Sequence, residues 1–206
     1  SDPKKSSSFY FSSGAVLKAA DAWQNEGQLR ALICLGCVEE TPVNNIRVPG
    51  SNFYVMGGIF DGNCDNMGLD GVYEAMHRLD DPYSPELFKG KLMRFAHVDN
   101  IALEKLTVKD PVSYGIQIAD AVGFVVRDIR FDYNWHFGTT DGVHINGPAR
   151  DGVIENLYGT TNDDLVSLTT YDEPHAEVSL GNIENVYIHN ITAINGFSGV
   201  RLLSGE

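Results

Sequence analysis

The chain has 206 residues, of which 43% are hydrophobic and 21% charged, with 21 glycines. This composition is typical of a soluble globular domain with many turns and excludes a collagen-like or disordered chain. Lys and Arg total 15 against 28 Asp and Glu, so the formal net charge is −13. We expect no nucleic-acid partner, because binding to a phosphate backbone depends on Lys and Arg. We expect no membrane partner either, because no apolar run approaches the ~20 residues of a membrane span.

Three cysteines do not form a disulfide framework. Cys34 and Cys37 have the spacing of half a metal site. However, ALICLGCV (31–38) is predicted to be a strand, where this spacing directs the two side chains to opposite faces. No second Cys/His pair with zinc spacing follows. We expect the cysteines to be small buried side chains and predict neither a structural metal nor a cofactor.

The first half of the chain contains short predicted strands. Residues 1–8 are polar and are predicted to be a tail, so that the single domain spans 9–206. Within 9–63, apolar segments are interrupted by Gly, Pro and Asn, as between short strands. Residues 64–91 are rich in Pro, Gly and Asp and are predicted to be a long loop, with a short helix at 71–79. Loops of this length are uncommon in compact domains unless they line a site.

From residue 92 the pattern repeats. Four similar segments each have an Asn or Asp turn between apolar residues: 100–108, 123–131, 151–159 and 185–193. Each is followed by a second short apolar piece, and these pieces are 114–118, 141–145, 164–168 and 198–202. The repeats are 23, 28 and 34 residues apart. Repeats of this size that cannot bury their own apolar face form solenoids. Because the pieces are short and β-branched, the fold class is predicted to be all-β, a right-handed parallel β-helix that is incomplete at both ends.

The repeat register predicts columns of side chains along this helix. Two inward columns are Ile116, Val143, Val166 and Val200, and Ile118, Ile145, Leu168 and Leu202. The outward column between them contains Gln117, His144, Ser167 and Arg201, and we expect it to be solvent-exposed beside a groove. The residues that begin these strands form a further column of Tyr114, Asp141, Asp164 and Ser198.

Three carboxylates are expected to converge in that register. Asp141 and Asp164 lie on consecutive coils, roughly 5 Å apart at the backbone, and Asp163 precedes Asp164. Mutual repulsion should raise the pKa of at least one of them so that it keeps a proton near neutrality. A protonated acid beside ionised carboxylates is what glycoside hydrolysis requires. Two other interpretations stay open: turn aspartates that only accept backbone N–H groups, and a Ca²⁺ site.

Several segments, in order, resemble the polygalacturonase family, family 28 of the glycoside hydrolases; they are FYFSSGAVLKAAD, NIRVPGSNFYVMGGIFDGN, LMRFAHVDNIALEKLTVKDPVSYGIQI, TTDGVHI and NDDLVSL. The resemblance implies a right-handed parallel β-helix that hydrolyses pectic or related polysaccharides with inversion, outside the cell or in the periplasm. Thr139-Thr140-Asp141 matches the family's Asn-Thr-Asp motif, and Asn162-Asp163-Asp164 its Gly-Asp-Asp motif. By that match, Asp163 is the general acid, while Asp141 and Asp164 hold and activate the attacking water.

The chain departs from the family pattern on the next coil. Ser198 stands in the column of the family's Gly-His-Gly histidine, and the family's Arg-Ile-Lys, which binds the substrate carboxylate, is not present. A neutral or differently decorated glycan is therefore a plausible substrate. Predicted substrate-binding residues are the groove-facing His144, Arg201, Gln117, Ser198 and Tyr114, with Trp135 and His136 as a sugar-stacking platform.

Two other functions fit the same fold. A polysaccharide lyase or epimerase would need a base near a uronate, for which Tyr114 and Arg201 are the candidates. A non-catalytic glycan-binding or tailspike-like trimeric module would need no acid at all. Because a β-helix that ends at Leu203 would expose its apolar stack, we also expect an oligomer or further chain segments to cover the ends.

Overall fold

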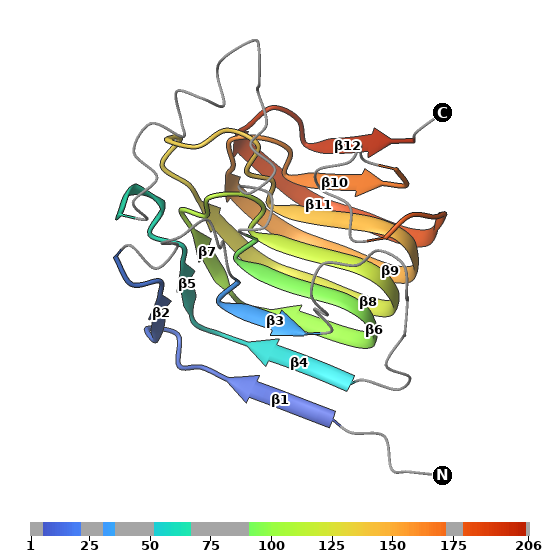
Figure 1. Ribbon diagram of the computed structural model, residues 1–206, viewed down its shortest axis with the longest axis horizontal. Helices are drawn as coiled ribbons and strands as arrows, with labels where there is room; N and C mark the ends of the chain where they lie inside the picture. The colour runs from blue at the N-terminus through green and yellow to red at the C-terminus, as the bar shows by residue number, and fades with distance from the viewer. Residues whose placement is uncertain (1–5, 22–30, 36–51, 67–90, 172–178, 205–206) are drawn as a thin grey trace.

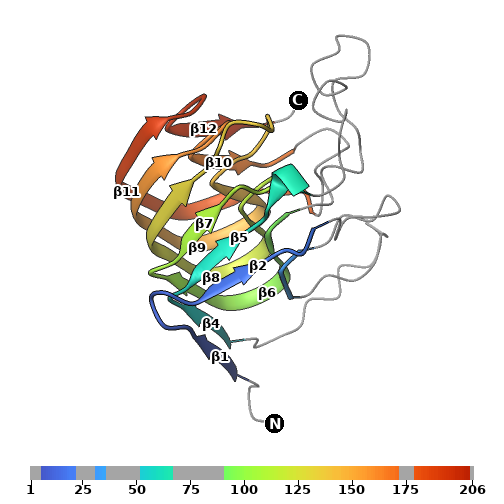
Figure 2. The same cartoon turned by 90° about the vertical axis from the view of Figure 1, so that its left-hand side faces the viewer.

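The protein is a parallel β-helix (Figures 1 and 2). The computed structural model describes residues 6–21, 31–35, 52–66, 91–171 and 179–204. The strand pairings among these residues are all parallel. The strands are β1 (Ser6–Tyr10), β2 (Val16–Lys18), β3 (Ile33–Leu35), β4 (Asn52–Met56), β5 (Ile59–Asp61), β6 (Met93–Glu104), β7 (Thr107–Lys109), β8 (Ile116–Asp132), β9 (Val143–Thr160), β10 (Val166–Thr169), β11 (Ile183–Asn195) and β12 (Val200–Leu203).

The pairings define three faces. The first face contains β3, β10, β12 and the beginnings of β6, β8 and β9. The second contains β1, β4, the later parts of β6 and β8, the middle of β9 and most of β11. The third contains β2, β5, β7 and the ends of β8 and β9. Long strands such as β8 and β9 run from one face to the next around the coil (Figure 1).

The core has the register that the sequence predicts. Ile116 pairs with Val143, Val143 with Val166, and Val166 with Val200. The first three side chains are fully buried, whereas Val200 on the last strand is 41% exposed and Leu202 75% exposed. Burial of each large aliphatic side chain contributes roughly 1.5–3 kcal/mol, so the stacked interior is the main source of stability.

Asn and Asp residues turn the chain at the corner between the second and third faces, as the sequence predicts. Asp128, Asn156 and Asn190 occupy equivalent positions with φ of 56°, 55° and 51°. Asn and Asp tolerate this left-handed conformation better than other residues with a side chain. The Nδ2 of Asn190 donates to Oδ1 of Asn156 at 2.5 Å, and the Nδ2 of Asn156 donates to Oδ1 of Asp128 at 2.9 Å. These hydrogen bonds tie successive coils together at the corner.

The predicted tail over residues 1–8 is wrong at its end. Ser6–Ser8 belong to β1 and pair with Asn52–Tyr54 of β4. A run of serines has no alternation of apolar and polar residues that would predict a strand. Their backbone groups nevertheless pair with β4. The predicted helix at 71–79 lies outside the described residues.

The expected loop begins with a short 3₁₀ turn, Cys64–Asn66, and residues 67–90 lie outside the described residues. Cys64 is a buried free thiol, as expected, and burial raises its pKa to about 12. Cys37 lies outside the described residues. Within the part of the chain that the structure describes, no helix is long and apolar enough to cross a membrane.

Candidate active site

The candidate site lies where the corner after the third face leads into the first face. Backbone hydrogen bonds fix its register: the N–H of Gly115 donates to the carbonyl of Asp141 at 2.8 Å, that of Gly142 to Asp164 at 2.9 Å, and that of Leu165 to Ser198 at 2.9 Å. Tyr114, Asp141, Asp164 and Ser198 therefore form one column on consecutive coils. This is the column predicted from the repeat.

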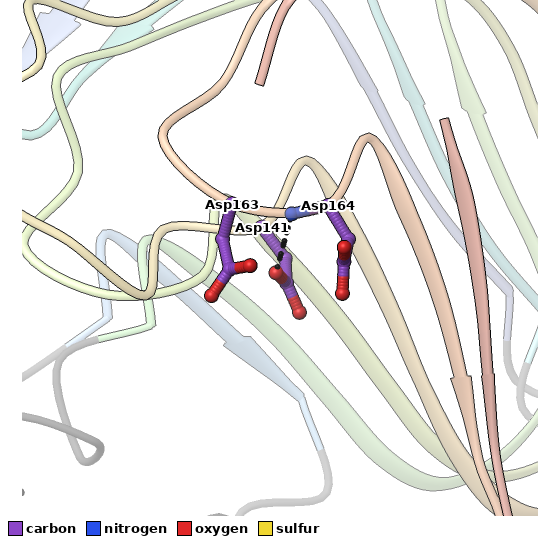
Figure 3. Close-up of side chains that lie close together, drawn as sticks. All are labelled: Asp141, Asp163 and Asp164. Atoms are coloured by element: carbon purple, nitrogen blue, oxygen red, sulfur yellow. Dashed lines mark hydrogen bonds between the residues drawn. The ribbon is translucent and has the colours of Figure 1, made fainter. Parts of the chain in front are cut away.

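Asp141, Asp163 and Asp164 lie side by side, and their carboxylates point the same way (Figure 3). One carboxylate oxygen of each lies within 4.8 Å of the others. Asp141 and Asp164 are buried, whereas Asp163 is half-buried. Among the described residues this is the group of acidic side chains close enough together to hold a cation.

The carboxylate of Asp141 is hydrogen-bonded at both oxygens. The backbone N–H of Asp164 donates to Oδ1 at 3.1 Å, and Nδ1 of His144 lies 2.6 Å from Oδ2 (the first of these is dashed in Figure 3). The Tyr133 hydroxyl donates to the backbone carbonyl of Asp141 at 3.2 Å. The next residue must be glycine, because a Cβ at Gly142 would lie 2.6 Å from a backbone oxygen of the next coil. Asp141 is thus held from its backbone and from its side chain.

Asp164 is held from the last coil. Ser198 Oγ donates to Oδ1 of Asp164 at 2.5 Å. The guanidinium of Arg201 lies 3.6 Å from Oδ2, which is buried and accepts no hydrogen bond. The ion pair compensates in part for burying this carboxylate, because an isolated buried charge is strongly unfavourable.

The surroundings of Asp163 favour its protonated form. Burial, then the negative charges of Asp141 and Asp164, raise its pKa to about 7, and Arg201 opposes the shift. All three raising effects disfavour the ionised form. Asp163 is therefore protonated in a large fraction of molecules near neutral pH, as the sequence-based argument from repulsion requires.

The turn that presents Asp163 is supported by its neighbours. Thr161 Oγ1 donates to the carbonyl of Asp163 at 2.8 Å, and the Asn162 side-chain amide donates to the carbonyl of Phe137 on the preceding coil. Thr140 Oγ1 donates to the same carbonyl at 3.3 Å. Two of these supporting residues, Thr140 and Asn162, lie inside the motifs singled out in the sequence.

The outward column next to the carboxylates is not the exposed face that we expected. Gln117 is fully buried, His144 is 2% exposed and Ser167 is 1% exposed; only Arg201 is well exposed, at 45% of its side chain. The Tyr114 and His144 rings stack at 4.0 Å with planes 5° apart. Gln117 Nε2 donates to Oδ1 of Asn146 at 2.8 Å. Polar side chains on coils about 5 Å apart therefore cover one another.

Trp135 and His136 lie in a turn one coil before Asp163. Trp135 is 42% exposed, with a φ of 66°, and the His136 side chain is 62% exposed. Nδ1 of His136 lies 2.6 Å from a carboxylate oxygen of Asp65, and Asn134 donates to the other oxygen of Asp65 at 3.1 Å. The exposed turn is therefore anchored to a coil about 70 positions earlier in the sequence.

Sequence reasoning missed three supporting residues: Tyr133, Thr161 and Asp65. Tyr133 is a buried aromatic whose hydroxyl happens to reach Asp141, and burial raises its pKa well above the usual value. No local pattern distinguishes it from a core tyrosine. Thr161 and Asp65 act through turns whose partners depend on the three-dimensional fold.

Comparisons with known proteins agree with this fold. The structure is similar to that of a family 28 exopolygalacturonase from Yersinia enterocolitica, with a TM-score of 0.65 and 16% sequence identity. The match covers 97% of this chain and 41% of that exopolygalacturonase chain, so this chain corresponds to less than half of it. No protein-family model matches the sequence, and neither does any curated protein. At this identity, the likeness supports the parallel β-helix fold.

Proposed function

We propose that the protein is a glycoside hydrolase that acts on a polysaccharide by acid/base catalysis. The observation that carries this proposal is the convergence of Asp141, Asp163 and Asp164, with a pKa of about 7 for Asp163. A proton donor with such a pKa beside two other carboxylates is the chemical equipment for cleaving a glycosidic bond. The likeness to the exopolygalacturonase supports the same class of reaction.

In the proposed mechanism, Asp163 protonates the oxygen of the leaving sugar. Asp163 is the only half-buried member of the group, so it is the one best placed to meet a polymer at the surface. Asp141 and Asp164 hold and activate the water that attacks the anomeric carbon. The new C–O bond forms as the glycosidic bond breaks, and one carboxylate takes the proton of the water.

The resemblance to family 28 implies inversion at the anomeric carbon. The spacing of the carboxylates makes retention of the anomeric configuration a second outcome to test. Oxygen atoms of the three carboxylates lie within 4.8 Å of one another, whereas carboxyl groups are about 5–5.5 Å apart in retaining and 6.5–9.5 Å apart in inverting enzymes. NMR of the first-formed anomer decides this point. A retained anomer would make Asp164 or Asp141 the nucleophile and leave Asp163 as the acid.

We propose a neutral or differently decorated glycan as the substrate. Arg201 is the exposed cation beside the carboxylates, and it faces Asp164. Trp135 and His136 offer an exposed aromatic turn for stacking a sugar ring. An extracellular or periplasmic location is proposed because polymeric glycans are found there.

The test is reducing-sugar release from a panel of plant and bacterial polysaccharides by the protein and by Asp163→Asn. Release by the protein and its loss in Asp163→Asn support the proposal. Release of products that absorb as unsaturated uronides would instead indicate a lyase. Glycan binding without turnover, unchanged in Asp163→Asn, would indicate a non-catalytic module.

A further inference from the structure

The carboxylates of Asp141 and Asp164 have different environments. Both oxygens of Asp141 have a hydrogen-bonding partner, the N–H of Asp164 and Nδ1 of His144. Asp164 has one oxygen bonded to Ser198, and its Oδ2 is buried 3.6 Å from the guanidinium of Arg201. Asp141 is therefore the carboxylate whose position depends on His144.

The contact between Asp141 and His144 is well defined. The two side chains are 4% and 3% exposed, so little water competes for their 2.6 Å contact. A carboxylate can only accept, so the tautomer that fits this contact has the hydrogen on Nδ1 and donates it to Asp141. Asp163 and Asp164 lie beside Asp141, and the ring of Tyr114 stacks on His144.

The orientation of the His144 ring is fixed by stacking. Tyr114 lies nearly parallel to it at 4.0 Å, and Lys91 Nζ, from the coil before, lies 4.8 Å from the centre of the Tyr114 ring. Aromatic stacking and the cation–π contact both favour this arrangement of the rings. The ring is therefore held in the plane in which Nδ1 meets Asp141.

We propose that His144 is a positioning residue that locks Asp141 in place. Locked Asp141 supplies a fixed acceptor for the water and for the Asp164 backbone. This role rests on the proposed hydrolase function. His144 acts through Asp141 and does not touch the sugar, in contrast to the substrate-binding role expected from the sequence.

Two substitutions of His144 separate the hydrogen bond from the packing. In His144→Asn, Nδ2 takes the place of Nδ1 and still donates to Asp141. In His144→Phe, the ring still stacks on Tyr114, but the donor is lost. A misplacement of about 1 Å in an active site can lower the rate on the order of 100-fold. We expect His144→Phe to lower kcat by about that factor with little change in KM, and His144→Asn to stay within about 10-fold of the unmodified protein.

A readout that does not depend on activity accompanies these rates. The amide N–H of Asp164 donates to Asp141, so its proton chemical shift in NMR reports where that carboxylate lies. We expect this signal to move in His144→Phe and to stay close to its original position in His144→Asn. If no glycan is cleaved, the hydrolase proposal fails, while the NMR comparison still decides whether His144 positions Asp141.

Equal kcat losses in His144→Asn and His144→Phe, or an Asp164 amide signal that does not move in His144→Phe, would overturn the proposal.

Discussion

The backbone N–H of Asp164 donates a hydrogen bond to the side chain of Asp141 at 3.1 Å, although the two residues are 23 positions apart in the chain. The coil-to-coil register produces this contact, and the same register brings Asp163 into the group. Bringing three like charges together lowers the stability of the folded protein, and such an arrangement is common at functional sites.

Replacing Asp163 should stabilise the protein above neutral pH while abolishing hydrolysis. The pKa of Asp163 is about 7 in the folded protein against 3.8 for a free side chain. The folded state therefore binds the extra proton between these values. Its stabilising contribution is fully present below about pH 4 and is lost as pH rises through about 7.

Asp163→Asn removes that loss, so at pH 8 we expect its free energy of unfolding to exceed that of the unmodified protein by about 1–3 kcal/mol, discounted for partial exposure. At pH 4 the two should be nearly equal. Denaturant unfolding at both pH values measures this, with Asp132→Asn, an exposed aspartate of β8, as the control. Equal free energies of unfolding at pH 8 would show that burial and the neighbouring charges do not raise the pKa of Asp163.

Removing Arg201 should move the pH profile. Arg201 lowers the pKa of Asp163, so Arg201→Gln should raise that pKa. Because the acid must be protonated, kcat/KM falls as pH rises through the pKa of Asp163 in the free enzyme. The basic limb should therefore shift to higher pH in Arg201→Gln. Arg130→Gln, which removes an exposed cation that pairs with Asp132 instead, should leave the limb in place. A shift to lower pH would contradict the assignment of Asp163.

Much of this site could be predicted from sequence because it depends on period and register. The two-residue alternation in Val143–Ile145 and Val166–Leu168 fixes which side chains face inward, and the 23-residue spacing places Asp141 beside Asp164. Both were found in the structure. The register of a parallel β-helix is easy to predict from sequence, because each coil repeats the strand pairing of the coil before it.

The contacts around the carboxylates could not be predicted in the same way. His144 follows Asp141 by three residues, a spacing that would place them apart in a straight strand; the corner before β9 brings them together. Burial of Gln117 and His144 depends on neighbouring coils and not on alternation, which only distinguishes inward from outward. Asp65 and His136 are joined across 71 positions, beyond the reach of any local pattern.

The corner hydrogen bonds make a separate prediction about stability. Asn156 both donates to Asp128 and accepts from Asn190, and it has a left-handed backbone. Asn156→Gly loses the hydrogen bonds but keeps the conformation, and should cost about 1–2 kcal/mol. Asn156→Ala also places an alanine in the left-handed backbone conformation, which is unfavourable for a residue with a Cβ, and should cost about 1 kcal/mol more. Denaturant unfolding compares them. Equal losses would mean that the backbone strain at this corner is negligible.

The most direct test of the proposed function is the dependence of Asp163→Asn on the leaving group. An acid is needed only when the departing oxygen is a poor leaving group. The measurement compares kcat/KM of both proteins on the polysaccharide that is cleaved and on a dinitrophenyl glycoside of the same sugar. With Asp163 as the acid, Asp163→Asn loses its activity on the polysaccharide, by on the order of 100-fold or more, but keeps most of it on the dinitrophenyl glycoside. Equal losses on both substrates, or none on either, would contradict the account.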